Sequence, residues 1–163
     1  MLILLDIDGV MVSAKSWSAP PILEDGFAMF NSKSVQALNE IIDKSKADIL
    51  LTTSHKSRFS LEQWAVIFKN RGISINNIDK LPQNHRHLSR LEEITNWYTS
   101  NDNIDNFLII DDDKSLNGLS SYLKTRLVLT KPLIGLTSSH VQDALRILNT
   151  PVEQVENVHL LKS

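Results

Sequence analysis

Short apolar runs alternate along this chain with segments in which apolar residues recur at helical spacing. The first run, Leu2–Ile7, is apolar apart from one acidic residue, which is typical of a strand buried on both faces of a sheet. The later runs predicted as strands are Asp48–Leu51, Ile73–Ile75, Phe107–Ile110 and Arg126–Thr130. Strands that alternate with helices form parallel sheets covered by helices. We therefore predict an α/β fold, a single three-layer, doubly wound domain with a five-stranded parallel sheet, over residues 1–150, followed by a C-terminal tail at 151–163.

Apolar stripes and capping signals predict the helices between these strands. Ser60 and Gln63 have the spacing of a capping box and predict the start of one helix. The other predicted helices occupy residues 34–46, Ser89–Thr99 and the segment that Thr137 caps.

Polar residues follow three of the predicted strands directly. The strands end in Asp6–Gly9, Thr52–Ser54 and Asp111–Asp113. Ligands of doubly wound sheets bind at the carboxyl ends of the strands, so these residues are candidates for one site. Carboxylates brought close together repel each other, and a divalent cation is the simplest compensation. Oxygen ligands of this kind suit Mg²⁺. Taken singly, the first motif could be an ordinary turn and the last a solvated loop or a helix cap.

Composition excludes several classes of chemistry. The 163 residues include no cysteine, which excludes disulfides, thiol catalysis and zinc–thiolate sites. The formal net charge of −2 does not force a basic patch. No apolar run is long enough to span a bilayer, and Asp6 and Asp8 interrupt the apolar start, which is unlike a signal peptide. We expect a cytoplasmic protein with no membrane partner.

Three segments resemble motifs of the haloacid dehalogenase (HAD) superfamily, whose members are mostly phosphatases. They are LILLDIDGV, DILLTTS and FLIIDDD, in the order that the superfamily has them. Other segments resemble a small branch without a cap domain, which includes the phosphatase-like domain of some RNA-repair proteins: ADILLTTSHKSR, LEEITNWY and IGLTSSHVQDALRIL. The motif order implies that the first strand is central, beside the second and the fourth.

The resemblance assigns roles by position. Asp6 would be the nucleophile, and Asp8 would be the general acid and base. Thr52 would hydrogen-bond a phosphoryl oxygen, with Thr53 and Ser54 as alternatives.

The same resemblance predicts a Mg²⁺ site. Asp111 and Asp112 would hold the ion together with Asp6 and the backbone carbonyl of Asp8.

The third motif of the superfamily is a basic residue that is usually Lys. This sequence departs from the pattern there. Arg90 fits its place best, and Lys80 and Arg86 are the alternatives. Arg90 could instead be a solvated helix-end residue that pairs with Glu93 or Asp113.

The predicted function is a Mg²⁺-dependent phosphoester hydrolase that forms an aspartyl-phosphate intermediate. The segment from Gly9 to Ser34 is too short for a folded helical cap, so the site should be open to bulky phosphomonoesters such as phosphorylated nucleic-acid ends, as well as to nucleotides.

One alternative is a catalytically weak or inactive relative that binds phosphate, because the motif Lys is missing. A phospho-accepting receiver domain is disfavoured, because no acceptor Asp follows Ile75. His55 is predicted to be a loop residue, either solvated or in contact with substrate phosphate.

Overall fold

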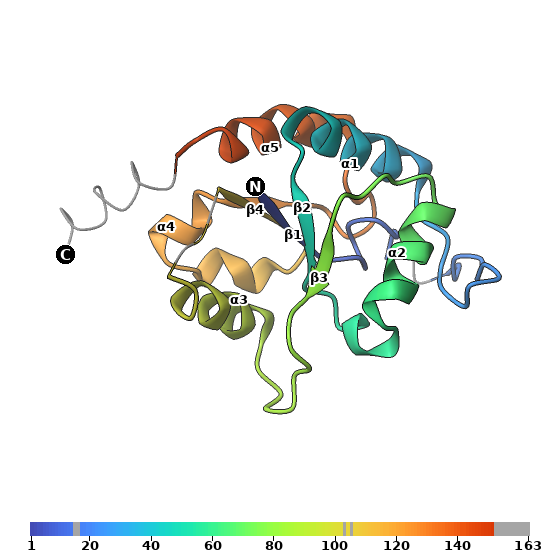
Figure 1. The fold of residues 1–163 in the computed structure, drawn as a ribbon, viewed down its shortest axis with the longest axis horizontal. Coiled ribbons are helices and arrows are strands. Elements are labelled where there is room, and N and C mark those ends of the chain that lie inside the picture. Colours follow the sequence, from blue (N-terminus) through green and yellow to red (C-terminus); the bar gives the residue numbers. More distant parts are fainter. Residues whose placement is uncertain (15–16, 103, 105, 152–163) are drawn as a thin grey trace.

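The computed structural model describes residues 1–14, 17–102, 104 and 106–151, and Figure 1 shows its fold. The strands are β1 (Leu2–Leu5), β2 (Asp48–Leu51), β3 (Ile78–Lys80), β4 (Phe107–Asp111) and β5 (Leu127–Leu129). The α-helices are α1 (Ser32–Ser45), α2 (Leu61–Asn70), α3 (Arg90–Thr99), α4 (Ser121–Lys124) and α5 (Val141–Leu148). The 3₁₀ helices are η1 (Lys56–Arg58), η2 (Lys114–Gly118) and η3 (Ser138–His140). All but Pro151 of the predicted tail at 151–163 lies outside the described residues.

The five strands form one parallel sheet in the order β3-β2-β1-β4-β5, which confirms the predicted α/β fold with β1 at its centre. The register aligns Leu5 of β1 with Leu51 of β2 and with Ile110 of β4. The residue that follows each of these therefore lies at the same level, at the carboxyl edge of the sheet. This register brings the polar residues of three separate motifs together.

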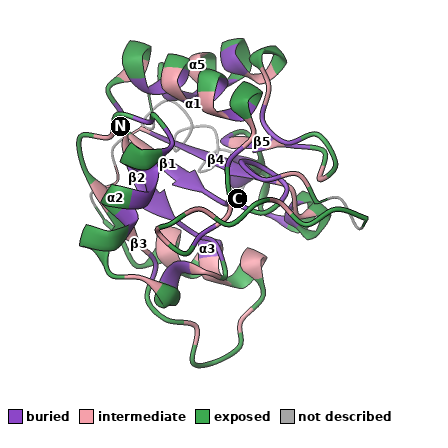
Figure 2. Ribbon diagram, turned by 90° about the vertical axis from the view of Figure 1, so that its right-hand side faces the viewer, coloured by how far each residue is buried: buried purple, intermediate pink, exposed green. Residues whose placement is uncertain are grey.

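Helices cover both faces of the sheet, because the strand side chains alternate between two cores. Ile3 and Leu5 pack into the core beneath α1, α2 and α5, whereas Leu4 packs into the core beneath α3 and α4. Figure 2 shows the strands as a buried layer between these helices. A strand buried on both faces needs apolar residues at every position, which explains the continuous apolar runs.

The third strand lies at Ile78–Lys80, so the prediction of a strand at Ile73–Ile75 was wrong. Gly72 ends α2 with a φ of 77°, and the backbone N–H of Ile73 still donates to the carbonyl of Phe68 in that helix. Ile73 is buried in the core with α1 and α2 rather than paired in the sheet. The apolar spacing at Ile73–Ile75 thus reflects packing against helices, which periodicity alone cannot distinguish from a short strand.

Capping boxes begin α2 and α3. Ser60 and Gln63 form the predicted box, and Ser89 forms a second one with Glu92. The Ser89 box fixes Arg90 as the first residue of α3. Thr137 caps η3, so the last α-helix begins later than predicted, at Val141.

The described residues of the segment between β1 and α1 form no folded cap domain. They form only two isolated bridges, Asp8 with Val12 and Ile22 with Ala28. Across the described residues of the whole chain, no helix combines the length and hydrophobicity required to cross a membrane.

Arg71, at the end of α2, holds this segment against the domain. Its Nη1 donates to Asp25 Oδ2 at 2.6 Å and its Nη2 to Asp25 Oδ1 at 3.0 Å. Its other N–H groups donate to the carbonyls of Phe27, Ala28 and Ile67. The two charged side chains are only 2% and 10% exposed. Hydrogen bonds from Arg71 lower the pKa of Asp25 to about 2.

We expect Arg71→Ala to lower the free energy of unfolding by about 3–5 kcal/mol, because it removes the five hydrogen bonds of a buried guanidinium and leaves the partly buried Asp25 without its cation. Urea unfolding followed by circular dichroism measures this loss. Arg146→Ala is the matched control, since Arg146 and its partner Asp143 are 67% and 70% exposed. That control should cost less than about 1 kcal/mol. Equal losses in the two variants would contradict the anchoring role of Arg71.

Candidate active site

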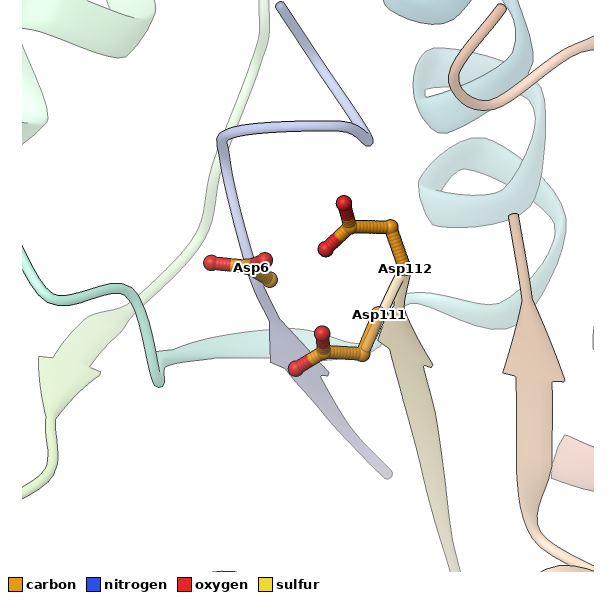
Figure 3. A group of neighbouring side chains, drawn as sticks. All are labelled: Asp6, Asp111 and Asp112. Carbon is orange, nitrogen blue, oxygen red and sulfur yellow. The ribbon is translucent and has the colours of Figure 1, made fainter. Parts of the chain in front are cut away.

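Three carboxylates meet at the carboxyl edge of the sheet (Figure 3). Asp6 follows β1, Asp111 ends β4 and Asp112 follows it. One oxygen from each carboxylate lies within 4.8 Å of the others. Asp6 and Asp111 are buried, with 5% and 0% of their surface exposed. The cluster brings together the first and the last of the motifs found in the sequence.

Arg90 enters this cluster from the start of α3. Its Nη1 lies 2.6 Å from Asp111 Oδ2 and 3.3 Å from Asp6 Oδ1. The same nitrogen lies 3.4 Å from the hydroxyl of Thr52, at the end of β2. A single guanidinium therefore joins the ends of three neighbouring strands. Arg90 also approaches Glu93, with Nε 3.9 Å from Oε1, so the alternative pairing with Glu93 exists beside the contacts in the cluster.

The two alternative bases lie elsewhere. Lys80 donates through Nζ to the carbonyls of Lys56 and Phe59, at 3.1 and 2.8 Å. Arg86 is exposed and lines a cavity between the 81–88 loop and α3. Of the three candidates, Arg90 is the one in contact with the acidic cluster.

Burial dominates the electrostatics of the cluster. It raises the pKa of Asp6 and that of Asp111 to about 6, although the nearby charge of Arg90 opposes both shifts. Burial also raises the pKa of Asp112. For Arg90, burial lowers the pKa, but the charges of Asp6 and Asp111 outweigh this effect and the net shift is upward. The guanidinium stays charged, and the acids beside it are costly to ionise together.

Gly9 allows the chain to turn closely over the cluster. It has a φ of 79°, and a Cβ at this position would overlap the carboxylate of Asp112. The carbonyl of Gly9 accepts a hydrogen bond from Thr130 Oγ1 at 2.7 Å. Both the positive φ and the contact with Asp112 require glycine here.

Asp8 stands at the open side of the site and contacts His55. Its side chain is 59% exposed, and its Oδ2 lies 2.7 Å from His55 Nε2. The other ring nitrogen, Nδ1, lies 3.3 Å from Arg58 Nη1. A guanidinium can only donate, so Nδ1 accepts and Nε2 carries the proton that His55 donates to Asp8. His55 was predicted to be a loop residue, and its contact with Asp8 was not predicted from the sequence.

The hydroxyl residues after β2 differ in their surroundings. Thr52 is buried and faces Arg90. Thr53 is also buried, but its Oγ1 accepts from the backbone N–H of His55 at 3.2 Å. Ser54 is exposed. Thr52 is therefore the hydroxyl in contact with the charged cluster.

Lys56 and Glu93 form a buried ion pair next to Arg90, which was not predicted from the sequence. Lys56 is 3% exposed, and its Nζ lies 2.9 Å from Glu93 Oε2. Glu93 thus lies between Lys56 and Arg90. Its position three residues after Arg90 predicted only the pairing with Arg90, and no local spacing links Glu93 to Lys56.

Comparison with known proteins identifies one family. The model of the family described as HAD domain in Swiss Army Knife RNA repair proteins matches residues 2–141, which span all five strands and the clustered acids. Searches of curated proteins and of solved structures gave no significant match.

We expect the metal-free protein to gain stability as the pH falls from 7.5 to 5. The folded-state pKa values of Asp6 and Asp111 lie near 6, above the unfolded value of 3.8, so the folded state binds more protons between these values and stability falls as the pH rises through them. Asp111→Asn should reduce the slope of melting temperature against pH in the presence of a chelator. A change in Tm of about 3 °C corresponds to about 1 kcal/mol for a domain of this size. Asp143→Asn, at an exposed site, is the control, and a slope in Asp111→Asn equal to that of wild type would contradict the assignment.

Proposed function

The chain belongs to the family of HAD domains in Swiss Army Knife RNA repair proteins, a family of phosphatase-type hydrolases, and on this basis we propose that it is a Mg²⁺-dependent phosphatase with Asp6 as its nucleophile. The observation that carries the proposal is the contact of one cation, Arg90, with Asp6 and Asp111 at the end of the central strands. An attacking carboxylate needs a fixed positive charge nearby, because it must approach an anionic phosphate.

Each of these side chains has a separate role in the proposed reaction. In the ionised form, Asp6 attacks the phosphorus and becomes an aspartyl phosphate. Asp8 protonates the leaving oxygen and then accepts a proton from the water that hydrolyses the acyl phosphate. The hydrogen bond from His55 to Oδ2 leaves Oδ1 of Asp8 available for this proton. Arg90 and the hydroxyl of Thr52, which contact each other, would donate to the phosphoryl oxygens.

The donor set fits a magnesium ion. Asp6, Asp111 and Asp112 present carboxylate oxygens that lie within 4.8 Å of one another. Two carboxylates in contact need either a proton or a cation between them, and hard oxygen ligands favour Mg²⁺. These three side chains and the carbonyl of Asp8 would hold the ion, which when bound supplies positive charge against the phosphate.

The substrate class follows from access to the site and from the family. The described residues include no cap domain over the cluster, and Asp8 is more than half exposed. An open site accepts a phosphate that is attached to a large molecule. The matched family is described by its occurrence in RNA repair proteins, and we propose phosphorylated nucleic-acid ends as the substrate.

A catalytically weak, phosphate-binding relative is the second candidate. The observation that favours it is the ion pair of Arg90 with Asp111 at 2.6 Å, since a cation engaged by a carboxylate is less available to a phosphate than the superfamily's usual Lys. Turnover measurements with variants of Asp6 and Arg90 separate the two candidates.

We expect Asp6→Asn to reduce hydrolysis of p-nitrophenyl phosphate in Mg²⁺ to the background rate, because it removes the attacking charge while keeping the shape of the side chain. Asp8→Asn should lower turnover by about 10²–10⁴-fold through loss of general acid–base catalysis. Asp143→Asn, on the exposed face of α5, is the matched control and should retain wild-type turnover. Circular dichroism checks that each variant is folded. Substantial turnover by Asp6→Asn would exclude Asp6 as the nucleophile, and a wild-type protein that binds phosphate without turnover would favour the second candidate.

We expect Arg90→Ala to lower turnover by about 10²-fold or more, the usual cost of removing one charge-stabilising donor. Arg90→Lys should retain part of the activity, since the charge remains but the guanidinium whose Nη1 reaches Asp6, Asp111 and Thr52 is lost. Lys80→Ala is the comparison, because Lys80 bonds to backbone carbonyls away from the cluster. If Lys80→Ala abolished turnover and Arg90→Ala did not, the third motif would lie at Lys80 instead.

A further inference from the structure

A cleft of about 520 Å³ opens beside Asp8. The segment between β1 and α1 forms one side of it through Val12 and Ile22, and the turn after β2 forms the other through His55 and Arg58. Asp6, Asp111 and Asp112 do not line this cleft. It is therefore a neighbour of the acidic cluster, reached across Asp8.

The role of Asp8 in the proposed reaction indicates which part of the substrate would lie in this cleft. In the proposed reaction Asp8 gives its proton to the oxygen that leaves the phosphorus. The leaving group must then lie within reach of Asp8 and opposite Asp6, because the nucleophile and the leaving oxygen take opposite sides of the transferring phosphoryl group. The cleft lies beside Asp8 and is lined by it, so it is the available space for the leaving group.

The walls of the cleft suit a flat, partly apolar group. Ile22 is a large apolar side chain with 66% of its surface exposed, and Val12 and the edge of the buried Phe27 continue the apolar surface. The volume falls within the range of about 300–1,000 Å³ that is typical of pockets for small organic ligands. A nucleoside, with a sugar and a heterocyclic ring, has this character, whereas a small polar alcohol would leave the apolar wall uncovered.

Arg58 supplies a positive charge at the same cleft. Its guanidinium carbon lies 5.7 Å from the ring centroid of Phe27 and 5.4 Å from that of Phe59. Its Nη1 lies 3.3 Å from Nδ1 of His55. Within the described part of the chain, Arg58 makes no ion pair, in contrast to Arg71 and Arg90. The two rings and the imidazole hold the guanidinium in place while its charge stays free for an anion.

We propose that this cleft is the leaving-group pocket and that it selects the terminal nucleotide of a phosphorylated oligonucleotide, with Arg58 binding the phosphodiester that follows this nucleotide. The inference rests on the proposed function and deepens it. Such a pocket distinguishes an oligonucleotide end from a free mononucleotide, because a mononucleotide has no second phosphate for Arg58 to bind. A phosphodiester is singly charged, and a guanidinium binds two of its oxygens at once.

Steady-state kinetics with three substrate types tests the proposal: methyl phosphate, uridine 3′- and 5′-monophosphates, and diuridine dinucleotides with a 3′- or 5′-terminal phosphate. For the wild-type protein, kcat/KM should rise in this order. Arg58→Ala should reduce kcat/KM for one of the terminally phosphorylated dinucleotides by about tenfold more than it does for methyl phosphate, the loss of one charge-assisted contact. Arg58→Lys should restore part of the difference. Arg146→Ala removes the same charge from α5, where Arg146 is exposed, and should leave the order and the ratios unchanged.

Two outcomes would overturn the inference while leaving the phosphatase standing. One is equal loss for all substrates in Arg58→Ala, which would show that Arg58 acts through His55 and Asp8. The other is a wild-type protein that hydrolyses mononucleotides as well as both dinucleotides. If no substrate is turned over, the proposed function fails. Calorimetry of the binding of the terminally phosphorylated dinucleotides to Asp6→Asn in Mg²⁺ then tests the nucleotide pocket independently of turnover. Binding that Arg58→Ala weakens about tenfold in that background supports it, and binding that is absent or unaffected overturns it.

Discussion

The repulsion among acids at the carboxyl edge of the sheet is the constraint on which the candidate site depends. Asp6, Asp111 and Asp112 converge there because the strands that carry them are adjacent and in register. Burial raises the free energy of their ionised forms, and the contacts of Arg90 offset only part of that increase. A cluster of this kind favours the uptake of protons or of a divalent cation.

The surrounding structure serves to keep Arg90 in that position. Ser89 begins α3 at the residue before it, so the guanidinium projects from the first turn of a helix that packs through Ile94 against the sheet. Glu93 lies one turn later and also binds the buried Lys56. The chain thus supports its cation with a second ion pair, that of Glu93 and Lys56.

The other side of the site is built from the segment between β1 and α1. Arg71 fixes Asp25 and the backbone near it to α2, and this places Phe27 beneath Arg58. The cleft beside Asp8 therefore has one wall held by a buried ion pair and another held by the turn after β2. The ion pair of Arg71 and Asp25 lies outside the acidic cluster, so it fixes this wall of the cleft independently of the acids.

The sequence by itself determined the sheet, the central place of β1 and the acids at the strand ends, because those features follow from local apolar patterns and from motif order along the chain. It misplaced the third strand, since Ile73 and Ile75 have the spacing of a strand but pack against helices. Only the tertiary structure decided that Arg90 rather than Lys80 reaches the acids, and that His55 contacts Asp8. These contacts join residues far apart in sequence, and their geometry depends on how helices and loops pack across the sheet, which no local pattern records.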